Sequence, residues 1–224
     1  MAPRILWALA LAALLASCGL VETAPQEAPS SAPVRDVLLV SEQSAGTRVR
    51  LVETVTQRLY EVDGATEFEV RASLNARGPG AGGAGAGARR GGFDGLTDWS
   101  LRWSFRYDRG PGYCALANST LELAIDVLLP ELAAPDAISP ELLARWQSYV
   151  SALENHEMGH VDRQRALAQE LAAAFEAAPP AANCSDLGRQ LNALGEDYLQ
   201  RIRLADATYD LETNHGMTQG AIFP

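Results

Sequence analysis

Apolar residues in the second half of the chain recur with the period of an α-helix. Across residues 142–175, apolar side chains and two histidines are separated by three, four or seven positions, so they share one helical face. Ser139 is suited to cap such a helix, Pro140 to begin it and Pro179 to stop it. The pattern therefore predicts one long helix between Ser139 and Pro179.

A second helical pattern follows near the C-terminus. Apolar residues at helical spacing run from Leu187 to Tyr209, and Ser185 is a candidate N-cap. We expect a helix over about residues 186–211. This helix would bring the polar segment that follows it, including His215, next to the first helix.

The first half of the chain predicts strands. Short apolar runs bounded by turn residues indicate strands at residues 36–40, 48–52 and 57–62. A short helix is expected over residues 66–75, with Phe68 and Leu74 facing inward.

Two longer strands are predicted before the first long helix. Residues 97–107 place their large side chains at every second position, which indicates a strand with one buried face. Those side chains are Trp99, Leu101, Trp103, Phe105 and Tyr107. Residues 114–129 form a further apolar run that Pro130 ends. Together these elements predict an α+β fold, a twisted and mainly antiparallel sheet packed on two long helices.

The N-terminus has the features of a bacterial lipoprotein signal. Arg4 precedes a 12-residue apolar core, which is too short to span a membrane, and small residues lead up to Cys18. We expect residues 1–17 to be removed and Cys18 to be lipidated, with 18–36 as a flexible tether. The alternative is an ordinary secretory signal. The residues after Cys18 favour the periplasm-facing outer membrane, and 37–224 then form a single domain.

Charge and cysteine content fit an exported protein. Without residues 1–17 the chain has 17 basic and 28 acidic residues, a formal charge of −11, which argues against nucleic acid or an anionic lipid surface as partner. Contact with the membrane is expected only through the lipid anchor. Cys114 and Cys184 are predicted to form a disulfide, worth roughly 4 kcal/mol for a loop of about 70 residues. Residues 78–92 are rich in glycine and predict an exposed loop.

The most specific feature is the pentapeptide His156-Glu157-Met158-Gly159-His160, which uses two of the three histidines in the chain. On a helix the two histidines lie one turn apart on one face and can bind one metal ion. Glu157 lies where it can take a proton from water, as in the H-E-x-x-H motif of zinc peptidases. The alternatives are a solvated stretch of helix, or core histidines that hydrogen-bond. Gly159 also weakens the helix, so a kink or two helices remains open.

The chain resembles an uncharacterised bacterial family of predicted secreted or membrane-anchored zinc-dependent proteases. The resemblance covers roughly residues 38–220. Its motifs, as they stand here, are Tyr60-x-Val62-x-Gly64, Thr97-x-Trp99-x-Leu101-x-Trp103, Cys114, Pro130, Trp146, His156-Glu157-x-Gly159-His160 and Tyr209-Asp210-x-x-Thr213-x-His215-Gly216. The resemblance implies a zincin-like fold and couples the two histidine motifs.

These motifs lead to a working hypothesis for the chemistry. Zn²⁺ would be held by His156, His160 and His215, with Glu157 as general base acting on a peptide or protein substrate. Asp210 would orient a ligand imidazole, and Tyr209 could donate to the oxyanion. For the third ligand, Asp210 and then Glu196 are the alternatives to His215.

Two other functions stay open from the sequence. One is a non-catalytic, lipid-anchored envelope protein whose zinc is structural or which binds a partner. The other is a hydrolase that acts on a cell-wall amide, because nothing in the sequence separates that substrate from a peptide.

Overall fold

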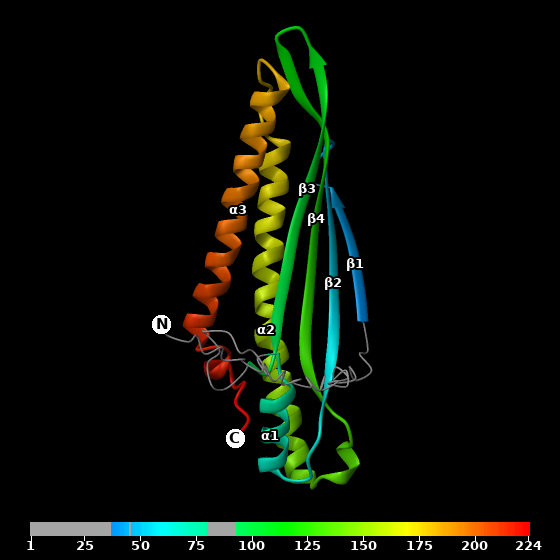
Figure 1. Cartoon of the computed structure of the whole chain (residues 1–224), viewed down its shortest axis with the longest axis vertical. Helices are drawn as coiled ribbons and strands as arrows, with labels where there is room; N and C mark the ends of the chain where they lie inside the picture. The colour runs from blue at the N-terminus through cyan, green and yellow to red at the C-terminus, as the bar shows by residue number, and fades with distance from the viewer. Residues whose placement is uncertain (1–36, 45, 80–92) are drawn as a thin grey trace, which may run out of the picture. The chain divides into compact units, whose positions relative to one another are not determined.

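Four strands form one mixed sheet in the order β1-β2-β4-β3 (Figure 1). The strands are β1 Val37–Ser44, β2 Val49–Val62, β3 Leu96–Gly110 and β4 Tyr113–Leu132. The pairs β1–β2 and β3–β4 are antiparallel, and β2 runs parallel to β4. This confirms the expected α+β class and the mainly antiparallel sheet. It also leaves β3 as an edge strand.

The computed structural model describes residues 37–44, 46–79 and 93–224. The predicted signal peptide, the lipidation site at Cys18, the tether and all but residues 78 and 79 of the Gly-rich loop lie outside this part. None of the helices within it combines the length and the apolar character that a membrane span requires.

Two predicted strand limits were wrong. The strands expected at 48–52 and 57–62 are one continuous strand, β2, because the polar residues between them pair in register with β4. Strand β4 also passes through Pro130 and ends at Leu132. On the β3 side the pairing stops at Leu128, so at Pro130 the strand has only one neighbour and tolerates a residue without an N–H.

The two long helices form as expected. Helix α2 spans Pro140–Glu176 without a break, and Ser139 caps it by accepting from the Leu142 amide. Helix α3 spans Cys184–Thr213 and packs along α2. Its cap is Asn183 rather than the expected Ser185, because the Asn183 side chain accepts from the Asp186 amide one turn ahead.

The short helix α1 spans Glu67–Arg77, and one of its two predicted inward-facing residues, Phe68, faces outward instead. Thr66 and Glu69 form a reciprocal capping box. Leu74 is buried as expected, but Phe68 is 82% exposed, and Val70 is buried in its place. The spacing of Val70 and Leu74, four residues, is the helical repeat that Phe68 does not fit.

The core lies between one face of the sheet and the helices α2 and α3. The aromatic stripe of β3 faces it, as predicted: Trp103 and Phe105 pack edge-on against Phe175 of α2. The expected disulfide between Cys114 and Cys184 is present and ties the start of β4 to the start of α3. These contacts fix α3 against β3 and α2, which positions the residues described next.

Candidate metal centre

His156 and His160 point from α2 into the protein. Their exposed fractions are 3% and 7%, and α2 continues through Gly159 without interruption. Because the residues are four apart, their rings lie on one face, with centroids 5.0 Å apart. Burial of two imidazoles requires polar partners, and the neighbouring helix α3 supplies them.

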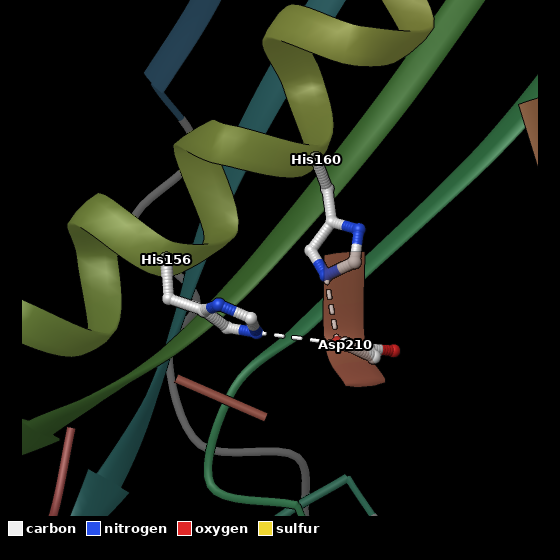
Figure 2. Close-up of side chains that lie close together, drawn as sticks. All are labelled: His156, His160 and Asp210. Carbon is white, nitrogen blue, oxygen red and sulfur yellow. Dashed lines mark hydrogen bonds and ion pairs between the residues drawn. The ribbon is translucent and has the colours of Figure 1, made fainter. Parts of the chain in front are cut away.

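Asp210 of α3 completes a three-residue cluster with the two histidines. Its Oδ1 atom is 3.4 Å from Nε2 of His156 and 3.1 Å from Nε2 of His160. Figure 2 shows both rings turning from α2 towards this one oxygen. The ligand atoms of the three residues all lie within 4.8 Å of one another, so the group can hold a metal ion.

Two of the three separations within the cluster agree with the geometry of a zinc site. Ligand atoms about 2.0–2.1 Å from a tetrahedral zinc ion lie about 3.3 Å from one another. The contacts of Asp210 with the two Nε2 atoms match that edge length. Two imidazoles and one carboxylate are also a donor set that zinc accepts in catalytic sites.

Each histidine is oriented through its other ring nitrogen. Nδ1 of His160 lies 3.1 Å from Oδ1 of Asp206, and Nδ1 of His156 lies 3.0 Å from Oε1 of Gln219. When Nδ1–H donates to these oxygens, Nε2 of each ring is directed at Asp210, and it can bind a metal ion once it has lost its proton. The sequence did not predict either orienting residue. The only signal for Asp206 is its position one helical turn before Asp210, and Gln219 gives none.

Asp206 is itself held by two further donors. The indole N–H of Trp99 donates to Asp206 Oδ2 at 2.9 Å, and the Gln164 amide donates to both carboxylate oxygens at 3.2 Å. Gln164 is fully buried. The aromatic strand β3 therefore supports the candidate metal centre through Trp99.

Charge interactions in the cluster are strong. Burial opposes the imidazolium form of His160, but hydrogen bonds to Asp206 and Asp210 raise its pKa to about 9. Burial also opposes ionisation of Asp210, yet hydrogen bonds from His156 and His160 hold the pKa of that carboxyl well below its ordinary value. Asp210 is therefore an anion that a cation between the rings would stabilise.

Glu157 lies beside the cluster with a carboxylate that is almost fully buried. Burial raises its pKa above the ordinary value, while a hydrogen bond from the Thr97 hydroxyl to Oε2, at 2.7 Å, acts against that shift. Its other oxygen lies against Gly95, where a Cβ atom would come within 2.6 Å of Oε1. Thr97 and Gly95, at the start of β3, thus set the position of the Glu157 carboxylate.

Tyr209 forms a packing link between the two histidines. Its ring stacks on His156 and meets His160 edge-on. Its hydroxyl accepts from the Gln219 amide at 3.0 Å and lies over Gly159, where a Cβ atom would come within 2.1 Å of it. Because Gly159 has no side chain, it leaves the space that the Tyr209 hydroxyl occupies.

His215 lies next to Asp210, outside the three-residue cluster. Asn214, His215 and Gly216 all have positive φ, so the chain reverses tightly after α3. This turn places Nδ1 of His215 3.6 Å from Oδ1 of Asp210, with its ring against Phe93. The other predicted alternative, Glu196, is exposed on α3 and does not belong to the cluster.

Comparison with known proteins gives a family. Residues 57–216, more than half of the chain, match the model of the family described as "Bacterial protein of unknown function (DUF922)". The chain belongs to the DUF922 family. No curated protein matches it, and neither does any solved structure.

The DUF922 match contains most of the site. Its range spans the pentapeptide, Asp206, Asp210 and His215, whereas Gln219 lies three residues beyond its end. The match places these residues within one family domain. The family description names no activity, so the chemistry of the site is inferred from its geometry alone.

A cavity of about 150 Å³ opens over the cluster. It is lined by the three cluster residues, Glu157, Asp206 and His215, with residues 93–97 as the opposite wall. That wall is fixed by Asp94, whose carboxylate pairs with Arg71 and accepts from the Tyr149 hydroxyl at 2.6 Å. Tyr60 donates to the Asp94 carbonyl at 2.7 Å. A small polar ligand therefore has access to both Glu157 and the cluster.

Proposed function

We propose that this chain is an envelope-anchored, zinc-dependent metallopeptidase. The observation that carries the proposal is the convergence of His156, His160 and Asp210 at the base of a cavity that also receives the Glu157 carboxylate. A purely structural metal site would not require a buried carboxylate, such as that of Glu157, that lies next to the ligands without being one of them. The zincin-like character of the fold and attachment through Cys18 are parts of the same proposal.

The donor set suits zinc and disfavours magnesium and calcium. Imidazole nitrogen and carboxylate oxygen suit zinc, whereas magnesium and calcium prefer oxygen ligands alone. Asp206 and Gln219 prepare the two rings by directing Nε2 at the ion, and Asp210 provides the negative charge. The residues present thus fit the ion.

The chain's own residues then supply the proton transfers. When bound, zinc supplies Lewis-acid chemistry, which lowers the pKa of water towards roughly 7 and polarises a carbonyl group. Glu157 takes the proton from the attacking water and passes it to the leaving amine. Burial suits Glu157 to this work because it raises the pKa of the carboxyl above its ordinary value, which makes the carboxylate a better proton acceptor.

Asp210 is the third ligand in this proposal, in place of His215, our first choice from the sequence. Its oxygen faces both Nε2 atoms, whereas His215 reaches only Asp210 itself. Zinc affinity of Asp210→Ala and His215→Ala separates the two assignments. We expect a large loss of affinity in Asp210→Ala and a small change in His215→Ala, and the reverse order would make His215 the ligand.

Tyr209 is assigned a positioning role. Its hydroxyl hydrogen-bonds with Gln219 and packs over Gly159, and its ring contacts both histidines. Donation from Tyr209 to an oxyanion stays a prediction from the sequence, and the present contacts favour the packing role.

The rival function is a lipid-anchored envelope protein with a structural zinc or a binding role. The position of His215 favours this rival, because a shift of its ring towards the ion would give a fourth protein ligand and close the site. A hydrolase acting on a cell-wall amide would use the same residues as the peptidase.

The activity test compares the zinc-loaded wild type with Glu157→Gln on casein and on a mixed peptide library. We expect cleavage by the wild type and loss of at least about 100-fold in the variant, the usual contribution of a general base. Zinc content is measured in both proteins as the control. If both bind zinc equally and neither cleaves, the rival function replaces this one.

A further inference from the structure

A groove continues from the metal centre along the free edge of β3. It has a volume of about 440 Å³ and lies between β3 and α3, the two elements that also wall the cavity at the cluster. The cavity is lined by residues 93–97, which end in the first two residues of β3, and the groove is lined by the next four residues of that strand, 98–101. From α3 the groove takes Leu199 and Arg203, one to two turns before Asp206. The cavity and the groove are therefore both lined by β3 and α3.

The free edge of β3 can receive an extended chain. Among the described strands β3 pairs only with β4, and Figure 1 shows it at the edge of the sheet opposite β1. The Asp98 carboxylate shields part of this edge by accepting from the Trp99 amide at 2.9 Å. A charged side chain at an edge works against pairing with a second copy of the same strand.

Arg203 is the cation of this groove. Within the described residues it forms no hydrogen bond and no ion pair, and it is exposed. Its neighbour Arg201, on the same helix, faces elsewhere: it pairs with Glu170 at 2.6 Å and covers the ring of Tyr198. A guanidinium that has no internal partner is matched in shape and charge to a carboxylate.

Resting on the proposed peptidase function, we propose that the groove binds an extended segment of a polypeptide substrate and that Arg203 pairs with an acidic side chain of that segment. Arg203 lies seven residues before Asp210, which is about 10 Å along a helix. An extended chain covers about 10 Å in three residues. The acidic side chain therefore lies about three residues from the bond that is cut. The substrate class is an acidic, unfolded stretch of protein.

The test maps cleavage sites in a proteome-derived peptide library by mass spectrometry. Three zinc-loaded proteins are compared: the wild type, Arg203→Gln, and Arg201→Gln as the matched control on the same helix. We expect aspartate and glutamate to be enriched at the third residue on one side of the cut, in the wild type and in Arg201→Gln only. Enrichment that persists in Arg203→Gln, or that is absent from the wild type, overturns the proposal.

A binding measurement separates this proposal from the peptidase function. Zinc-loaded Glu157→Gln is titrated with two fluorescein-labelled peptides that differ only in one central glutamate or glutamine. We expect the glutamate peptide to bind about fivefold more tightly, the upper range for an exposed ion pair, and Arg203→Gln in the same background to abolish the difference. Equal binding of the two peptides overturns the groove assignment. If discrimination is present while the wild type cleaves nothing, the groove stands and the peptidase function fails.

Sedimentation velocity tests the competing occupant. We expect the chain to sediment identically with Arg203 and with Arg203→Gln. A dimer that Arg203→Gln dissociates would assign the groove to a second copy of the chain and overturn the proposal.

Discussion

At the scale of single residues, the site depends on hydrogen bonds that fix the ligand rings. Asp206 orients His160 and Gln219 orients His156, so each Nε2 faces Asp210 before any ion binds. Such orienting partners typically contribute a factor of 10 to 100 in metal affinity. The candidate site therefore includes Asp206 and Gln219 as well as the three cluster residues.

Replacement of Asp206 tests this support. We expect Asp206→Ala to weaken zinc binding by about 10- to 100-fold, because His160 loses the acceptor that directs its ring. Competition with a chromogenic chelator measures the affinity. The control is Asp197→Ala, an exposed carboxylate on the same helix. Equal affinity in the two variants would contradict the role of Asp206.

The glycine of the pentapeptide gives a second test. Glycine to alanine in a helix ordinarily stabilises by about 1 kcal/mol. At Gly159 we expect destabilisation by about 1–3 kcal/mol instead, because the new methyl group would overlap Tyr209. Gly188→Ala on α3 is the control, since its Cβ would meet only the end of the Tyr107 side chain. Urea unfolding reports the difference, and a Gly159→Ala protein as stable as wild type would refute the packing.

The sequence predicted the local part of this site and missed the long-range part. His156, Glu157 and His160 follow from the period of one helix, which fixes their relative positions. The choice between Asp210 and His215 depends on the left-handed turn after α3, which residue types alone do not determine. Gln219 lies beyond that turn, so its contact with His156 was not predictable from spacing.

At the scale of elements, helix caps and strand continuity decided where prediction succeeded. Ser139 was predictable as a cap because a favoured Pro140 follows it. Asn183 and Ser185 are both suitable residues, and only the hydrogen bond from the Asp186 amide to Asn183 shows which of them caps α3. Strand β2 was predicted as two pieces because its middle is polar. Those polar residues are held by pairing with β4, a contact that the sequence pattern does not reveal.

The end of α2 is joined to β2 by one carboxylate. Glu176 accepts from the backbone amides of Arg48 and Val49, each at 3.0 Å, and from the Arg48 side chain. Burial opposes its ionisation, but these hydrogen bonds hold the pKa of Glu176 below its ordinary value. A carboxyl with a lowered pKa stabilises the fold at neutral pH, and this contribution is lost as the pH falls through the folded-state pKa.

A pH series on Glu176→Gln checks this link. We expect the variant to be about 1 kcal/mol less stable than wild type at pH 7, from weaker hydrogen bonds. The difference in stability between the two proteins narrows below about pH 4.5, because the wild-type carboxyl becomes protonated. Glu154→Gln, an exposed position on α2, is the control without such a trend. A gap that stays constant between pH 7 and pH 3 would contradict the assignment.

At the scale of the whole molecule, the site joins parts of the chain that are far apart in sequence. Helix α2 supplies two ligands and Glu157, α3 supplies Asp210 and Asp206, and the start of β3 supplies Thr97. The disulfide joins the start of β4 to the start of α3, at the end of α3 away from Asp210, and the sequence predicted it correctly because the exported chain offers only two cysteines after Cys18. Helix α3 is thus anchored at both ends, by the disulfide at its start and by the contacts of Asp206 and Asp210 with His160 near its end.

Removal of the metal tests this coupling. A ligand at about 1,000 times its dissociation constant stabilises a protein by about 4 kcal/mol. For a domain of this size we expect chelation to lower Tm by roughly 10 °C, with the disulfide intact. Calorimetry with and without chelator measures the shift, and restoration by added zinc is the control. A zinc-loaded protein whose Tm does not respond to chelation would contradict a metal that joins α2 to α3.

The most direct test of the account is zinc K-edge X-ray absorption on the purified, zinc-loaded chain. We predict a shell of four nitrogen and oxygen atoms at about 2.0–2.1 Å, with the outer scattering of two imidazoles and no sulfur. His156, His160, Asp210 and one water give that spectrum. The signal of a third imidazole would show that His215, and not Asp210, is the third ligand. A chain that binds no zinc at all would contradict the central claim.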